Sequence, residues 1–144
     1  MSMIKWNMGL LTGIEEIDLH HRSLIQLLNE VYQDFMAGIN LEAEVIDRVF
    51  NCTAYCFDCE ETWMIETAYP DFAEHKAEHE LFTVRFLEIY QHHKQDSNTC
   101  VDVLLTFNNW ISHHFTETDA KFGHFVEVQR LKTSVMKELA SRPK

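Results

Sequence analysis

The stretch FAEHKAEHELFTVRFLEI, residues 72–89, decides the fold class that we predict for this chain. Its apolar and histidine positions recur at spacings of three and four residues, which is the period of one face of an α-helix. These positions are Phe72, His75, His79, Phe82, Phe86 and Ile89. We therefore expect an amphipathic helix that turns two imidazoles, those of His75 and His79, toward the core.

Three other stretches show the same periodicity. The first runs through Ile14, Ile17, His21, Leu24, Leu28, Val31 and Phe35. The second runs through Val45, Val49, Cys52, Cys56, Cys59 and Trp63. The last runs through Cys100, Val103, Phe107, Trp110, Ile111 and His114. Each of them predicts a further amphipathic helix.

The breaks between the four stretches are short. They fall at residues 38–40, at Tyr69 and Pro70, and at residues 95–98. Short connections force successive helices to run antiparallel, so the prediction is an all-α fold, an up-down-up-down antiparallel four-helix bundle. We expect an N-terminal arm before Ile14. Gly123 is a candidate terminator of the fourth helix, ahead of a short C-terminal helix over about residues 126–139.

Composition narrows the class of protein. The 144 residues suit one domain over 1–144, and a net charge of −11 without a basic cluster argues against nucleic-acid partners and anionic membranes. We see no apolar run long enough for a signal peptide or a membrane span. The four cysteines have no disulfide-framework spacing. We expect thiols in a reducing compartment and a cytoplasmic protein.

Polar residues of the four predicted helices meet at one depth. His21 lies about 19 residues before the first break, and Cys56 and Glu60 lie about 16 to 20 residues after it, so both helices reach this depth roughly 24 to 30 Å from that end. Counted from the second and third breaks, His75 and His79 of the third helix and His114 of the fourth helix lie at the same depth. The layer then holds His21, Cys56, Glu60, His75, His79 and His114. Buried imidazoles and carboxylates are costly without partners, so the layer predicts a metal site in the core.

The acidic ligands follow less directly from periodicity. Glu60 lies about 60° from the centre of the apolar face of its predicted helix. Glu61 points almost directly away from that face and is expected to be a solvated surface charge. Asp119 falls roughly 110° off its stripe, so it reaches the layer only if the helix loosens or carries a bulge there. Periodicity alone equally offers His113 with Glu117.

These residues resemble the hemerythrins, and among them the single-domain bacterial form, over most of the chain from Trp6 to about Phe122. The matching positions are Trp6, Gly13 and Ile14, Ile17 and Asp18, His20 and His21, Leu24, the run from Phe57 to Glu61, Met64, Tyr69 and Pro70, His75 and His79, Trp110, His114 and Asp119. The resemblance implies a four-helix bundle with two irons, bridged by carboxylates and an oxygen species, that binds O2 reversibly. It implies that His75, His79 and His114 bind one iron and His21 the other, and that Glu60 and Asp119 bridge the pair.

Two positions depart from the family pattern. Cys56 stands where the family has a histidine on the iron with the open coordination position, and His20 stands where glutamine is usual. A cysteine side chain is two atoms shorter than the far nitrogen of a histidine, while metal–sulfur bonds are only about 0.2 to 0.3 Å longer. Either the thiol falls short, and water takes the position or that iron is weakly held, or the sulfur binds as a thiolate and favours O–O cleavage.

Three hypotheses of function follow. The favoured one is a non-catalytic protein that binds or senses O2, or a similar diatomic ligand, at a non-heme di-iron centre. The second is a di-iron enzyme that reduces O2, peroxide or nitric oxide. The third is a metal or redox sensor, or a storage protein, with one firmly held metal and cysteines that report oxidation. Imidazole also suits zinc or manganese, so iron itself follows mainly from the resemblance.

Overall fold

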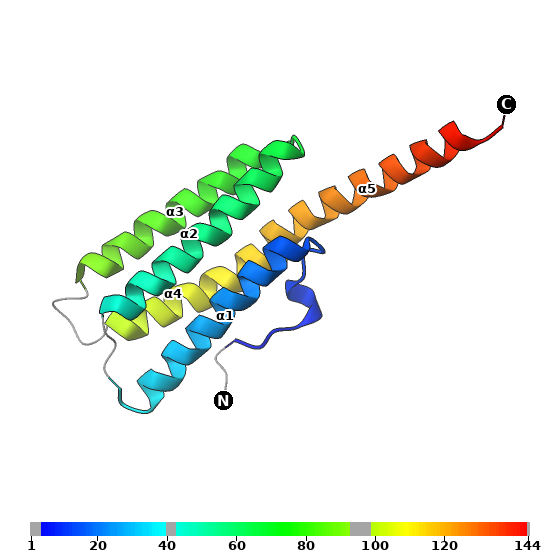
Figure 1. Cartoon of the computed structure of the whole chain (residues 1–144). Coiled ribbons are helices and arrows are strands. Elements are labelled where there is room, and N and C mark those ends of the chain that lie inside the picture. Colours follow the sequence, from blue (N-terminus) through cyan, green and yellow to red (C-terminus); the bar gives the residue numbers. More distant parts are fainter. Residues whose placement is uncertain (1–3, 40–42, 93–98, 144) are drawn as a thin grey trace.

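Four antiparallel helices form the body of the protein. The computed structural model describes residues 4–39, 43–92 and 99–143. The helices are α1 (Glu15–Met36), α2 (Ala43–Glu66), α3 (Phe72–His92) and α4 (Thr99–His113). Each packs on its neighbour in sequence, and α1 also packs on α4, which closes the bundle (Figure 1). The predicted all-α, up-down-up-down bundle is confirmed. Within the described ranges, no helix combines the length and the apolar character needed to cross a bilayer.

The first helix ends where the sequence indicates. Gly38 adopts a left-handed conformation, with φ of 75°. The amide of Ile39 donates to the carbonyl of Asp34 at 2.9 Å and the amide of Gly38 to that of Phe35 at 3.1 Å. This pair of bonds is a Schellman motif, and it satisfies carbonyls that the helix end would otherwise leave free. Asn40, which the sequence also offers as a cap for the second helix, and the break at residues 95–98 lie outside the described residues.

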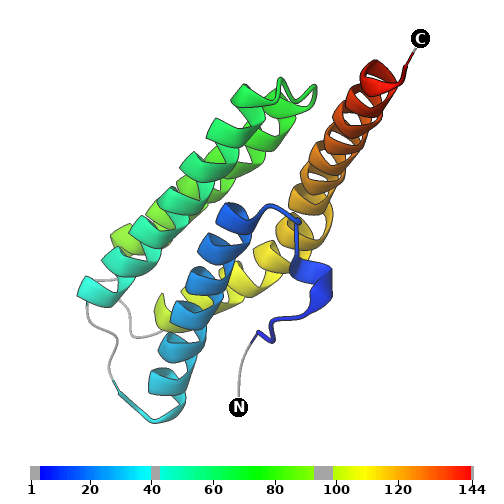
Figure 2. The same cartoon turned by 45° about the vertical axis from the view of Figure 1, so that its right-hand side comes forward.

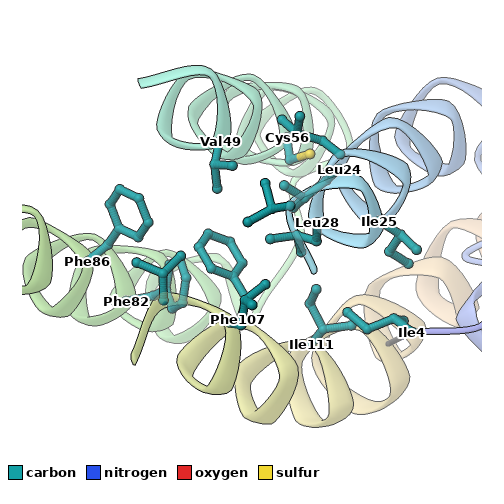
Figure 3. Packing of buried hydrophobic residues seen from close by; sticks show 14 of the residues in the cluster. Ile4, Leu24, Ile25, Leu28, Val49, Cys56, Phe82, Phe86, Phe107 and Ile111 are labelled. Atoms are coloured by element: carbon teal, nitrogen blue, oxygen red, sulfur yellow. The ribbon is translucent and has the colours of Figure 1, made fainter. Parts of the chain in front are cut away.

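The apolar core is divided into two clusters. The larger one includes Leu24, Leu28, Val49, Phe82, Phe86 and Phe107 (Figure 3). The smaller one includes Ile14, Ile17, Met64, Tyr69 and Phe122. Along α1, His21 falls between residues of the smaller cluster and residues of the larger one, and Glu60 and Asp119 are likewise flanked by residues of both clusters. The layer is therefore sealed by apolar packing on both sides, and each fully buried large side chain contributes about 1.5–3 kcal/mol to that packing.

The C-terminal part differs from the prediction in its boundaries. A π-helical segment, η2 (His114–Asp119), follows α4 directly and leads into α5 (Ala120–Ser141), a 22-residue helix that projects beyond the bundle (Figure 2). The helix is present as predicted, but it starts six residues before Val126 and is not short. Gly123 lies inside it and does not end a helix. A Cβ at Gly123 would overlap the backbone of Thr12, so glycine here permits close approach of the arm.

The N-terminal arm is tied to the bundle by polar contacts. The backbone amide and carbonyl of Ile4 both bond the side-chain amide of Asn29, at 2.9 and 2.8 Å. Asp18 accepts from the amide and the hydroxyl of Thr12, each at 2.8 Å. The short helix η1 (Met8–Leu10) packs against η2. The arm therefore covers the segment that carries His114 and Asp119.

Candidate metal centre

The structure brings six polar side chains together in the interior, five from the predicted layer and Asp119 from the family resemblance. His21 comes from α1, Glu60 from α2, and His75 and His79 from α3, while η2 supplies the remaining two. All six are at most 2% exposed: His21, Glu60, His75, His79, His114 and Asp119. The imidazole nitrogens that converge are all Nε2, and the two carboxylates lie between them.

Three imidazoles surround one oxygen of Glu60, and two of the same three lie against one oxygen of Asp119. Oε1 of Glu60 lies 3.1 Å from Nε2 of His75, 3.2 Å from that of His79 and 3.5 Å from that of His114. Oδ1 of Asp119 lies 3.0 Å from Nε2 of His75 and 3.1 Å from that of His114. One donor atom from each of these five residues lies within 4.8 Å of the others. We call this group the three-imidazole pole.

The other carboxylate oxygens face a single imidazole. Nε2 of His21 lies 3.2 Å from Oε2 of Glu60 and 3.3 Å from Oδ2 of Asp119. We call this group the single-imidazole pole. Each carboxylate therefore turns one oxygen to each pole, which is the arrangement by which carboxylates bridge two cations.

The π-helical segment explains how Asp119 reaches the layer. In an α-helix a residue five positions after His114 points to a different face, but a π-helix bonds residue i to i+5 and brings the two positions nearly into line. The loosening that Asp119 requires is thus present in η2. Glu117 instead pairs with His113 at 3.0 Å, and both side chains are exposed.

Two further carboxylates orient the imidazoles from outside. Oε2 of Glu61 lies 3.1 Å from Nδ1 of His79, and Oε1 of Glu78 lies 3.4 Å from Nδ1 of His114. The hydroxyl of Thr118 also donates to Glu78, at 3.0 Å. Glu61 is therefore not the solvated charge that helix periodicity indicates, because it reaches across to α3. Sequence reasoning also missed Glu78, whose only signal is its place beside His79.

These outer carboxylates fix which nitrogen carries the proton. When Nδ1–H of His79 and of His114 donates to its carboxylate, each Nε2 is left with a lone pair that points inward. The two Nε2 atoms are only 3.1 Å apart. Two facing lone pairs at this distance require a shared proton or a cation. Both oxygens of Asp119 are also buried without a hydrogen-bond partner among the described residues. The donor set fits metal ions.

The carboxylates change the acidity of the imidazoles. Burial alone would lower the pKa of His75, but its contacts to Asp119 and Glu60 outweigh burial and raise that pKa to about 9. The pKa of His114 is raised well above its usual range for the same reasons. Burial opposes ionisation of Glu60, yet hydrogen bonds from its neighbours hold its pKa well below the usual range. Without metal, protons take the place of cations in the layer.

A family model described as the Hemerythrin HHE cation binding domain matches residues 12–125. The chain belongs to the hemerythrin family. It is 33% identical over 132 residues to the bacteriohemerythrin of Stenotrophomonas maltophilia (strain R551-3), covering 88% of this chain and 84% of that relative. It is 28% identical over 124 residues to the bacteriohemerythrin of Pseudomonas aeruginosa (strain LESB58), covering 85% and 80%.

Solved hemerythrin structures share the fold. A crystal structure of wild-type hemerythrin is 22% identical, with a TM-score of 0.70 over 85% of this chain and 96% of that one. A crystal structure of a hemerythrin point mutant aligns with a TM-score of 0.71 at 22% identity over the same shares. The four-helix bundle expected from the family resemblance is thereby confirmed.

In this hemerythrin family member, Cys56 lies beside the single-imidazole pole. Its side chain is 1% exposed, and its thiol donates to the backbone carbonyl of His20 at 3.4 Å. A hydrogen bond with Cys52, burial and the nearby charges of Glu60 and Asp119 raise the pKa of this thiol well above its usual range. Cys56 is therefore buried in the apolar cluster next to the layer with its thiol engaged by the backbone, and it is not among the five residues whose donor atoms converge within 4.8 Å.

Aromatic rings cover three of the imidazoles. Phe115 stacks on His21 with ring centroids 3.9 Å apart, Phe57 stacks on His79 at 3.9 Å, and Trp110 stacks on His114 at 4.1 Å. Such rings hold the imidazole planes in place and keep water from the layer. His124, outside the layer, is exposed, while the side chains of His92, His93 and Cys100 lie outside the described residues.

Proposed function

We propose that this protein is a non-catalytic oxygen-binding protein with a non-heme di-iron centre in the buried layer. The observation that carries the proposal is the division of each carboxylate between the two poles, which lets Glu60 and Asp119 bridge two cations. Two irons bound in this layer would supply the reversible binding of O2. The family membership supports the same function.

At the three-imidazole pole, we assign His75, His79 and His114 as ligands of one iron. Three neutral imidazoles with two carboxylate oxygens form a donor set that suits iron and also suits zinc or manganese. Glu61 and Glu78 hold two of these rings in the tautomer that presents Nε2. This pole therefore binds its cation firmly.

At the single-imidazole pole, we assign His21 as the ligand of the second iron, together with Oε2 of Glu60 and Oδ2 of Asp119. Cys56 occupies the position from which the family supplies another imidazole. The pKa of its thiol is raised, and the thiol already donates a hydrogen bond to the His20 carbonyl. Coordination of a metal by this sulfur therefore requires loss of the proton and of that hydrogen bond. We infer that this pole binds its cation more weakly and keeps an open position for a small diatomic ligand.

The remaining side chains protect the bound ligand. Phe115 and Phe57 face imidazoles of opposite poles, and the two apolar clusters close the layer above and below. Exclusion of water would limit proton delivery into the layer, and this environment would favour release of O2 over its reduction.

A second candidate function is redox turnover, in which the protein reduces O2, peroxide or nitric oxide. It is favoured by one observation, the position of Cys52 and Cys56 four residues apart on α2, with the Cys56 thiol bonded to the carbonyl of His20, the neighbour of the candidate ligand His21. Cys52, Cys56 and Cys59 are free thiols. Thiols of this kind persist in a reducing compartment, which supports the proposed cytoplasmic location.

Iron analysis combined with absorption spectra tests the proposal. The purified protein is loaded with Fe²⁺ without oxygen, exposed to air, and then deoxygenated. We expect a visible band that rises in air and falls again on deoxygenation. Continuous O2 or peroxide consumption with an added reductant would instead establish the enzyme, and a single bound metal with no spectral response to O2 would leave only a metal or redox sensor.

A further inference from the structure

A second group of metal-binding side chains lies where α1 packs on α2, outside the buried layer. Its members are Glu16, His20 and Cys59, and one donor atom from each lies within 4.8 Å of the other two. Glu16 is exposed, His20 is half-buried, and Cys59 is 8% exposed. The group is therefore reached from solvent on one side and closed by the helix interface on the other.

Regular helix geometry builds this group. Glu16 and His20 are four residues apart on α1, so both point from one face toward α2. On α2, Cys59 and Trp63 have the same spacing and face α1. His20 and Cys59 are each next to a residue of the buried layer, His21 and Glu60, which fixes the backbone at both positions.

The carboxylate of Glu16 is held in place for binding. The indole Nε1 of Trp63 donates to its Oε2 at 2.9 Å. The thiol of Cys59 lies within 4.8 Å of a Glu16 oxygen, and burial together with the Glu16 charge raises the pKa of this thiol to about 12, so a bound cation must displace its proton. Within the described part of the chain, no lysine or arginine forms an ion pair with Glu16. Its charge is thus oriented by the neutral indole of Trp63 and is left for a cation.

The donor types define the cation. Thiolate, imidazole and carboxylate together are the set that binds Zn²⁺, and three protein ligands leave a fourth tetrahedral position for water. Neither pole of the buried layer has a sulfur among the donors described above. The mixed set therefore selects a softer cation than the carboxylate-bridged layer does.

We propose that Glu16, His20 and Cys59 form a separate zinc site that links α1 to α2. On binding, the Cys59 thiol releases its proton to solvent and its sulfur bonds to Zn²⁺, with no change of oxidation state. The zinc then joins the two helices one residue away from His21 and Glu60. It stabilises the relative position of two candidate iron ligands that lie on different helices.

Zinc titration of the iron-loaded protein tests this proposal. Calorimetry measures the affinity, and X-ray absorption at the zinc edge identifies the ligands while iron content is followed in the same sample. We expect one zinc beyond the iron, one sulfur at about 2.3 Å and nitrogen or oxygen at about 2.0–2.2 Å. Absence of zinc binding, or zinc that enters only as iron leaves, would overturn the proposal.

Matched serine variants locate the sulfur. Cys59→Ser is expected to remove the sulfur signal and weaken zinc binding by roughly a hundredfold or more, since even outer-shell losses reach that size. Cys52→Ser and Cys56→Ser are expected to keep the signal. If the sulfur survives in Cys59→Ser, or disappears in Cys56→Ser, the assignment is wrong. His20→Gln, which leaves the buried thiol in place, is a second test: it must weaken zinc binding by at least about tenfold.

Discussion

The two poles of the buried layer share the same carboxylates but differ in how many imidazoles they offer. Oε1 of Glu60 lies within 3.5 Å of the Nε2 atoms of three histidines. Among the described residues, Oε2 of Glu60 has one imidazole nitrogen beside it, Nε2 of His21 at 3.2 Å. Cys56 stands where the family resemblance implies a histidine, and it is the residue that we propose leaves the single-imidazole pole with fewer ligands.

The difference between the two poles indicates which pole binds iron firmly and which pole reacts with O2. The three-imidazole pole is supported by outer carboxylates at two of its rings, while Nδ1 of His21 has no hydrogen-bond partner among the described residues. We infer that the first pole retains its iron and that the second determines what happens to O2.

The largest effect is expected for Glu60→Gln, which removes the charge shared by both poles. Breaking a buried charged pair costs about 3–5 kcal/mol, so iron binding should weaken by more than about a hundredfold at both poles. Iron per chain after desalting measures the loss, and circular dichroism checks the fold. Glu117→Gln, a change at an exposed glutamate near the layer, is the control. Retention of two irons by Glu60→Gln would break the assignment of Glu60 as a bridge.

Removing one imidazole from each pole in turn tests whether the two poles bind iron with different strength. His21→Ala eliminates the only imidazole of its pole, so we expect roughly one iron to remain at the intact pole. His75→Ala leaves two imidazoles at its pole but exposes a buried carboxylate, and it should lose the firmly held iron. Chelator competition followed by iron analysis distinguishes the two variants. Equal loss from both would show that the poles are not different.

Smaller effects are expected from the outer carboxylates. Glu78→Gln removes the acceptor at Nδ1 of His114, and such changes typically weaken metal binding by about 10- to 100-fold. Glu61→Gln should act similarly through His79. The control is Glu80→Gln, which alters an exposed glutamate of α3. Iron affinity at the single-imidazole pole should change less than at the three-imidazole pole, and the opposite order would contradict the assigned contacts.

Changes of pH give the smallest predicted effect. In the metal-free protein the pKa of His75 is raised from 6.5 to about 9, so its charge stabilises the fold fully below pH 6.5 and this contribution is lost as pH rises through 9. We expect the free energy of unfolding to fall by roughly 1–3 kcal/mol over this window. The iron-loaded protein should not show the decrease, because iron has replaced the proton. Denaturant unfolding at several pH values measures both, and parallel curves for the two forms would refute the argument.

Most of the fold and of the inner layer could be predicted from the sequence. The helix stripes located His21, His75, His79 and His114 because an inward position in an α-helix depends only on spacing. Asp119 required a π-helical segment that spacing alone does not reveal, and only the family resemblance favoured it over Glu117.

Contacts between helices could not be predicted in the same way. Glu61 points away from its own stripe but meets His79 on α3, so its role depends on the packing of two helices. Gly123 suggests a helix end in the sequence, whereas the structure uses it where the arm approaches α5. Both cases depend on distances between segments far apart in the chain.

The most direct test of the unequal poles is the iron content of the wild-type protein and of Cys56→His under the same limiting chelator. The wild-type protein should retain roughly one iron per chain and Cys56→His roughly two, because a histidine supplies the far nitrogen that the cysteine lacks. Reversible O2 binding should strengthen together with the second iron. If Cys56→His folds normally and retains no more iron than the wild-type protein, the account of the two poles is wrong.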